Sequence, residues 1–160
     1  MEQILVKLVE DCYGISPKLT KGFVIGEEYE EKGSYGVIRY GCLGTNCNFI
    51  VKIIDADTDI PHEGCYSHRD VTINEMVITK YLSDMLIAPE IYDMALGSDE
   101  GILIMEKYDG TLSDLLFNYQ TDRNIDIDFY INKVIELTKQ MHKEGIIHRD
   151  LNTNNIVYKN

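Results

Sequence analysis

The sequence predicts a mixed α+β fold in which strands and one helix come first and further helices follow. Residues 23–55 are rich in β-branched and aromatic side chains and are interrupted by glycines, which is typical of consecutive strands. Residues 70–85 carry apolar side chains at helical spacing, and residues 90–109 return to the strand pattern. After Gly110 the pattern becomes helical again, so we expect a boundary near residues 108–112.

The first expected region, residues 23–108, follows an amphipathic lead-in of residues 1–22. Three strands are predicted within residues 23–55, with a hairpin turn at Gly44-Thr45-Asn46, and residues 55–68 are predicted to form a loop. A helix over Asp70–Met85 then has Glu75 on its apolar side. Two more strands are expected around a turn at Gly97–Gly101.

The second expected region, residues 109–160, contains a short helix over the segment TLSDLLFNY and a longer helix over DIDFYINKVIELTKQMHKEG. Gly145 stands in the C-terminal capping position of the longer helix, where glycine tolerates a left-handed backbone. The apolar face of this helix consists of Tyr130, Val134, Leu137 and Met141.

The composition is that of a globular protein, with 44% hydrophobic and 26% charged residues. The net charge of −12 argues against nonspecific binding to nucleic acid or to an anionic membrane, because both need a basic surface. No apolar run has the length of a bilayer-spanning helix. The N-terminal residues lack the basic start of a signal peptide, so we expect a cytoplasmic or nuclear protein.

Cysteine and histidine residues raise the question of a metal site. Cys42, Cys47 and Cys65 are near His62 and His68 in sequence, which makes a zinc site conceivable. Their spacing is irregular and no C-x-x-C occurs. We therefore expect reduced thiols in a cytosolic protein.

Two further features are open to a structural and a functional interpretation. Gly33 and Gly36 stand three apart between strand-like segments, where they form a simple turn or let backbone amides approach a phosphate. Lys52 interrupts the apolar run FIVKII. It either extends from an edge strand into solvent or pairs with a carboxylate, for which Glu75 is the candidate.

The segment HRDLNTNN is the most specific feature of the chain. It resembles the catalytic loop of protein kinases, H-R-D-L-x-x-x-x-N, with matches at His148, Arg149, Asp150, Leu151 and Asn155. The segment GSYGVI is similar to the end of the kinase glycine-rich loop, and IVKI is similar to the strand that carries the phosphate-binding lysine. The resemblance spans residues 23–160. It implies a kinase N-lobe, which is an antiparallel sheet with one helix, followed by the first helices of an incomplete C-lobe.

The resemblance also implies roles for particular residues. Asp150 would orient the acceptor hydroxyl and receive its proton, and Lys52, paired with Glu75, would hold the α- and β-phosphates of ATP. Asn155 would bind Mg²⁺ through oxygen. The remaining residues implied to contact the nucleotide are Gly33, Gly36, Ile38, Ile50, Met105, Glu106, Tyr108 and Val157.

Some positions depart from the kinase pattern. Glu31 stands at the first glycine of the glycine-rich loop, and Ile50 replaces a small residue above the adenine. Asn152 replaces the lysine of serine/threonine kinases, and Asn154 replaces the arginine of many tyrosine kinases. The acceptor class is therefore open between the two, and a missing lysine reduces charge stabilisation near the γ-phosphate.

The family's D-F-G segment and activation segment do not follow Tyr158 in this sequence. The expectation is a protein kinase-like chain that is incomplete and inactive alone, with a protein substrate if it is completed. The alternative is a non-catalytic, pseudokinase-like module that binds a nucleotide or a partner. A small-molecule phosphotransferase of related fold is disfavoured by Arg149. The apolar stripe from Tyr130 to Met141 is expected to be exposed and to associate with itself or with a second polypeptide.

Overall fold

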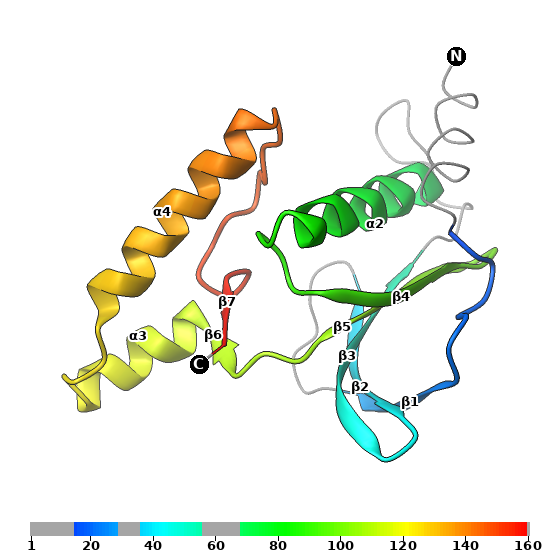
Figure 1. Cartoon of the computed structure of the whole chain (residues 1–160), viewed down its shortest axis with the longest axis horizontal. Helices are drawn as coiled ribbons and strands as arrows, with labels where there is room; N and C mark the ends of the chain where they lie inside the picture. Colours follow the sequence, from blue (N-terminus) through cyan, green and yellow to red (C-terminus); the bar gives the residue numbers. More distant parts are fainter. Residues whose placement is uncertain (1–14, 29–35, 56–67, 160) are drawn as a thin grey trace. The chain divides into compact units, whose positions relative to one another are not determined.

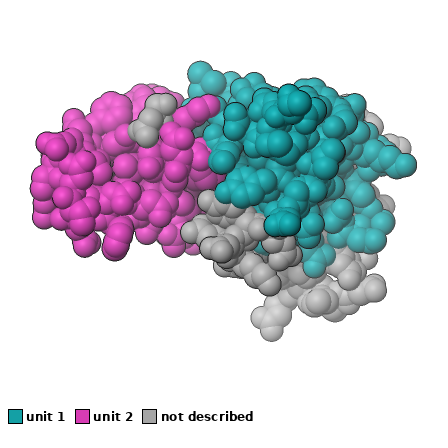
Figure 2. Space-filling view, turned by 90° about the horizontal axis from the view of Figure 1, so that it is seen from below, with its two compact units in different colours: residues 1–107 teal, residues 108–160 magenta. Residues whose placement is uncertain are grey.

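The computed structural model describes residues 15–28, 36–55 and 68–159. The chain splits into two compact units, residues 1–107 and residues 108–160 (Figure 2). The domain ranges expected from the sequence, 23–108 and 109–160, stay a prediction. No helix in the described part of the chain is long and apolar enough to cross a membrane.

The first unit contains a five-stranded sheet in the order β1-β2-β3-β5-β4 (Figure 1). Every neighbouring pair in it is antiparallel. The strands are β1 (Phe23–Glu28), β2 (Val37–Leu43), β3 (Asn46–Asp55), β4 (Ile91–Leu96) and β5 (Glu100–Glu106). The predicted α+β fold with an antiparallel N-terminal sheet is therefore confirmed. Three of the strands lie within residues 23–55 and two within residues 90–109, as the side-chain pattern indicated.

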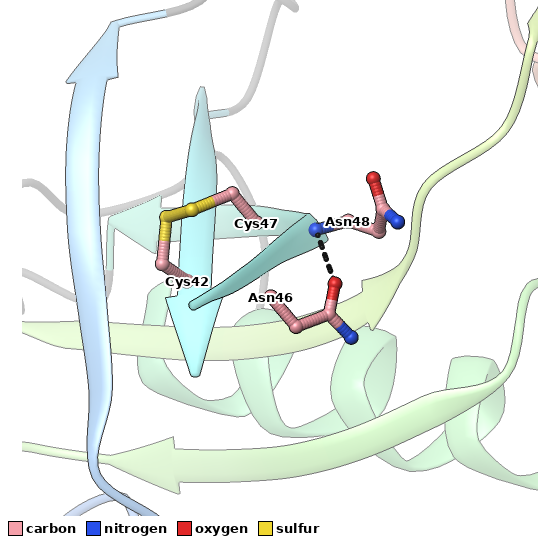
Figure 3. Close-up of a disulfide and its surroundings, with 4 residues drawn as sticks. All are labelled: Cys42, Asn46, Cys47 and Asn48. Carbon is pink, nitrogen blue, oxygen red and sulfur yellow. Dashed lines mark hydrogen bonds between the residues drawn. A yellow bond between two sulfur atoms is a disulfide. The ribbon is translucent and has the colours of Figure 1, made fainter. Parts of the chain in front are cut away.

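A tight hairpin joins β2 to β3, and it corrects the expectation of reduced thiols. Gly44 has a φ of 61° in this turn, a conformation that glycine adopts without steric cost. The register places Leu43 opposite Asn46, so the flanking Cys42 and Cys47 meet and form a disulfide (Figure 3). Side chains that lie directly opposite each other on paired strands are close enough to interact. The spacing of two cysteines along the sequence does not show whether they lie opposite each other.

The disulfide also removes two of the candidate zinc ligands. No group of three or more His, Cys, Asp or Glu side chains among the described residues could hold a metal ion. His62 and Cys65 lie outside the residues that the structure describes.

Helix α2 (His68–Asp84) packs on one face of the sheet. It begins two residues before the predicted Asp70 and ends one residue before Met85. Gly101 of β5 permits the close approach, because a Cβ atom there would lie 2.6 Å from Thr72 Cγ2 and 2.7 Å from Met76 Sδ. Met76 is fully buried as a result.

The other face of the sheet carries a cluster of Phe49, Val51 and Ile104, which Leu19 of the segment before β1 helps to cover. Phe49 makes an edge-to-face ring contact with Phe23 at 5.0 Å and another with Tyr92 at 5.1 Å. Such contacts add to the burial of apolar surface. The central strands β3 and β5 are therefore covered on both faces, by α2 on one side and by the apolar cluster on the other.

The buried Asp93 of β4 attaches the segment before β1 to the sheet. Its carboxylate accepts hydrogen bonds from the Thr20 backbone N–H at 2.8 Å, from the Thr20 hydroxyl at 3.1 Å and from the Lys21 N–H at 2.9 Å. The Met94 N–H donates a further bond at 2.9 Å. A buried carboxylate needs such partners, because an unpaired charge is costly away from water.

The second unit consists of a two-stranded ribbon and two helices. Its elements are β6 (Gly110–Thr111), α3 (Leu112–Thr121), α4 (Ile127–Lys143) and β7 (Val157–Tyr158). Helix α3 begins with a capping box, in which Thr111 and Asp114 satisfy each other's backbone N–H groups. Helix α4 begins at Asp126 as N-cap, and Gly145 follows it with a φ of 75°, in agreement with its predicted capping role.

The apolar stripe of α4, from Tyr130 to Met141, is partly covered in the structure. Met141 is buried with an exposed fraction of 4%, and Tyr130 contacts the ring of Tyr158 at 5.8 Å. Tyr130, Val134 and Leu137 are half-buried. The expected exposure of this stripe is therefore found only in part, because α3 and Tyr158 of β7 contact α4. Ile131 and Ile135, which lie on another flank of α4, are exposed instead.

Candidate functional site

The ion pair between Lys52 and Glu75 connects the sheet to α2 in the first unit. Lys52 Nζ donates to Glu75 Oε1, and the two side chains are 31% and 28% exposed. The predicted pair is thus confirmed, and Lys52 does not simply extend into solvent from an edge. Its strand, β3, lies between β2 and β5 and is therefore not an edge strand. The ammonium group reaches Glu75 of α2.

Other residues expected to contact a nucleotide share this face of the sheet. Ile38 of β2 is the register partner of Lys52, and Ile50 is the partner of Met105. Because side chains alternate along a strand, Ile38, Ile50, Lys52 and Met105 lie on the same face. Ile50 is only 3% exposed, so the bulk of its side chain fills space on this face.

The glycines of the predicted glycine-rich loop are only partly described. Gly33, like Glu31, lies outside the described residues. Gly36 lies just before β2, where a Cβ atom would be 2.4 Å from the Ile53 carbonyl oxygen. No larger residue fits there without a shift of the backbone. The close approach to Ile53 is therefore a structural reason for glycine at position 36, and it does not depend on phosphate binding.

The residues after Met105 were expected to offer backbone groups to adenine. The Glu106 N–H donates to the Glu90 carbonyl at 2.8 Å, so this donor is already used. Tyr108 is half-buried and belongs to the second unit. Between them, Lys107 Nζ lies 4.7 Å from the centre of the Tyr40 ring, a cation–π contact that the sequence did not indicate. No local signal links residues so far apart in the chain.

In the second unit, Asp150 lies in an exposed turn that polar side chains hold together. Asn155 Nδ2 donates to Asp150 Oδ2 at 2.8 Å and to the Asp150 carbonyl at 2.8 Å. Asn152 Nδ2 donates to Asp150 Oδ1 at 3.0 Å. The structure thus brings together two of the predicted residues, Asp150 and Asn155. It adds Asn152, which sequence reasoning treated only as a departure from the kinase pattern.

The backbone of this turn is unusual at Arg149, which has a φ of 64°. A side chain other than glycine rarely adopts this left-handed region, and the conformation costs free energy. The hydrogen bonds of Asp150 with the two asparagines follow directly after it. Strained backbone next to a fixed carboxylate is typical of functional sites.

The resemblance implies a magnesium ion at Asn155, and the donor atoms fit one. All hydrogen bonds of the Asn155 side chain in the described part of the chain use its Nδ2. Its amide oxygen is therefore oriented away from these bonds, and Mg²⁺ prefers oxygen ligands of this kind. Asn155 could hold the ion through Oδ1 while its Nδ2 fixes Asp150.

The ribbon of β6 and β7 anchors the end of the turn. Val157, expected to contact the base, pairs with Thr111. Burial, with the nearby charge of Asp109 as a second cause, raises the pKa of Tyr158. The hydrogen bonds from the Thr111 backbone N–H and hydroxyl lower the pKa of Asp114.

Comparison with known proteins gives a consistent result. The family model of the protein kinase domain matches residues 29–160. Ribosomal protein S6 kinase alpha-1 of Mus musculus is 23% identical over 158 residues, which cover 96% of this chain and 20% of that protein. Serine/threonine-protein kinase SMU1 of Mycosarcoma maydis is 23% identical over 156 residues, which cover 97% of this chain and 19% of that protein. The chain thus spans about a fifth of the length of these relatives.

Among solved structures, the BubR1 kinase domain has a similar fold. It matches with a TM-score of 0.60 and 14% identity, over 96% of this chain and 53% of that one. At this identity the likeness concerns the fold alone.

Proposed function

The chain belongs to the protein kinase domain family, and from this premise we propose that it transfers the γ-phosphoryl group of ATP to a hydroxyl group of a protein. The observation that carries the proposal is the ion pair between Lys52 and Glu75. The two residues are 23 positions apart, and they meet only because α2 packs on the face of the sheet that carries Lys52.

In the first unit, Lys52 would bind the α- and β-phosphates, and Glu75 would hold its ammonium group in place. A fixed cation stabilises phosphate charge without reorganising during the reaction. Ile38, Ile50 and Met105 would form the apolar surface against the adenine. Gly33 and Gly36 would belong to the loop over the phosphates. The Glu106 carbonyl and the Tyr108 backbone would be offered to the base, because the Glu106 N–H is bonded to the Glu90 carbonyl.

In the second unit, Asp150 would accept the proton of the substrate hydroxyl as that hydroxyl attacks phosphorus. Proton removal by a positioned base accelerates such reactions by about 10²- to 10⁴-fold. Asn155 would hold Asp150 through Nδ2 and Mg²⁺ through Oδ1, and Val157 would contact the base. The ion, when bound, neutralises charge on the phosphate oxygens.

The proposal assigns ATP and a protein substrate as partners, Mg²⁺ as cofactor, and the cytoplasm or nucleus as location. A second candidate is nucleotide binding without catalysis. Two departures from the kinase pattern favour this second candidate. Ile50 is bulky and buried where kinases carry a small residue above the adenine, and Asn152 is neutral where serine/threonine kinases carry a lysine near the γ-phosphate.

The test measures ATP binding and phosphate transfer separately. Lys52→Met should weaken MgATP binding in calorimetry about tenfold or more, since it removes a charged phosphate contact. Lys80→Met is the matched control, because Lys80 also pairs with a carboxylate, that of Asp84, and is similarly exposed at 28%. Equal affinities of the two variants, or no ATP binding by the unmodified protein, would contradict the proposal.

Phosphate transfer from radiolabelled ATP to protein then distinguishes the two candidates. Asp150→Asn should abolish transfer while leaving ATP affinity unchanged. Binding without any transfer by the unmodified protein would instead support the non-catalytic candidate. In that case Ile50→Ala should raise ATP affinity if the bulk of Ile50 limits the space for adenine.

A further inference from the structure

We propose that Asn152 is a positioning residue, which holds the Asp150 carboxylate in one orientation and couples that orientation to the backbone of the turn. The inference deepens the proposed function and rests on it for its catalytic meaning. It assigns a role to the position at which serine/threonine kinases carry a lysine. In this chain the side chain there acts on the carboxylate beside it.

The two oxygens of Asp150 are each held by a different amide. Asn152 Nδ2 donates to Oδ1 at 3.0 Å, and Asn155 Nδ2 donates to Oδ2 at 2.8 Å. A carboxylate held by one oxygen can still rotate about its terminal bond, which is a soft torsion. With a donor on each oxygen, the plane of the carboxylate is defined. Each oxygen keeps a further lone pair with which to accept the proton of a substrate hydroxyl.

Asn152 is itself fixed by the backbone that follows it. Its Oδ1 accepts hydrogen bonds from the Asn154 N–H at 3.0 Å and from the Asn155 N–H at 3.2 Å. Its backbone carbonyl accepts from the same Asn155 N–H at 3.1 Å. The acceptor end of the side chain therefore closes the turn, and the donor end holds Asp150.

Burial contributes little to this arrangement, since Asp150, Asn152 and Asn155 are all exposed. Without packing, the orientation of Asp150 depends on the two amides. The short side chain of Asn152 reaches its neighbour, and it lacks the length and charge with which a lysine reaches a phosphate. Loss of Asn152 should therefore affect the chemical step more than ATP binding.

The first experiment uses three variants of the full chain. Asn152→Ala removes both ends of the side chain, whereas Asn152→Asp keeps an oxygen that can close the turn but lacks the N–H donor. Asn154→Ala is the matched control, because the Asn154 side chain makes none of the hydrogen bonds recorded among the described residues. For Asn152→Ala and Asn152→Asp we expect kcat to fall about 10- to 100-fold, as for a displaced catalytic group. The KM for ATP should not change.

The outcome for Asn152→Asp separates positioning from simple folding of the turn. Activity like that of the unmodified protein in Asn152→Asp would show that only the turn matters, and would overturn the proposal. Losses of kcat in Asn154→Ala equal to those in Asn152→Ala would overturn it too.

A second measurement does not depend on phosphate transfer. In ¹H–¹⁵N spectra, Asp150→Ala should shift the side-chain amide resonances of Asn152 and Asn155, whereas those of Asn154 should stay in place. Unchanged Asn152 side-chain resonances would overturn the positioning role even in an active kinase. If they shift in a protein that transfers no phosphate, the positioning contact stands and the proposed function fails.

Discussion

The two units of the chain fix their functional side chains by different means. In the first unit, Lys52 stands on β3 beside fully buried residues, which are Val51 of the same strand and Leu103 and Ile104 of β5. In the second unit, Asp150 stands in an exposed turn that asparagine side chains hold. Apolar packing thus positions the lysine, and hydrogen bonds position the carboxylate. The position of Lys52 depends on many residues that are far apart in the sequence, and the position of Asp150 depends on a few residues adjacent to it.

The balance of buried and exposed apolar side chains shows the same contrast. The described residues of the second unit include four buried side chains: Thr111, Leu112, Leu115 and Met141. Six of its large apolar side chains are exposed: Phe117, Phe129, Ile131, Ile135, Ile147 and Leu151. We therefore expect the first unit to be the more stable of the two, because buried apolar area is the main favourable contribution to folding.

The largest expected effect comes from truncating the core of the first unit. Leu103→Ala should lower the free energy of unfolding by about 3–4 kcal/mol, since Leu103 is fully buried in β5. Leu115→Ala in α3 should cost less, about 2 kcal/mol, because the smaller core around it can collapse more readily. Urea unfolding, combined with hydrogen exchange to separate the units, measures both.

Phe117→Ala serves as the control, because Phe117 is 70% exposed and should change stability by less than about 0.5 kcal/mol. If Leu115→Ala lowers the free energy of unfolding as much as Leu103→Ala does, the cores of the two units do not differ as we expect.

An intermediate effect is expected from the Cys42–Cys47 disulfide. The bond closes a short loop, with a sequence separation of 5, so its loss in the double variant Cys42→Ser/Cys47→Ser should cost about 2 kcal/mol at most. Thermal unfolding with and without dithiothreitol measures this cost. The unmodified protein should lose stability on reduction, and the double variant should not respond. Complete alkylation of Cys42 and Cys47 without reductant would show that the bond is absent.

The smallest effect concerns pH and the start of α3. Hydrogen bonds from Thr111 lower the pKa of Asp114 from its ordinary value of 3.8. A lowered pKa in the folded state means that the stabilisation is present above about pH 4 and is lost as the pH falls through the folded-state value. Asp114→Ala should cost about 1 kcal/mol at neutral pH, as for a lost cap, and should flatten the decline below pH 4.

Thr111→Val provides the control, because it removes the hydroxyl partner of Asp114 while keeping a side chain of similar size. Thr111→Val should reproduce part of the stability loss of Asp114→Ala. The double variant should lose less stability than the sum of the losses in the two single variants. Additive losses would mean that Thr111 and Asp114 act independently.

The sequence predicted much of the fold and part of the candidate site. Alternation and helical spacing located all five strands of the sheet and three helices, because these patterns follow from local backbone geometry. The limits of α2 differed by one or two residues, since helix ends depend on local contacts. The ion pair of Lys52 and Glu75 could be predicted because a charged residue inside an apolar strand requires a partner.

Only the tertiary structure decided which residues meet and which faces are covered. The stripe from Tyr130 to Met141 was identified correctly as one face of α4, but its burial depends on where α3 and β7 lie. The pairing of Cys42 with Cys47 depends on the register of β2 and β3. The role of Asn152 depends on the turn that brings its amide to Asp150. Periodicity reports which side of an element is apolar. Burial, register and side-chain hydrogen bonds depend on what lies opposite in space, which a local pattern does not contain.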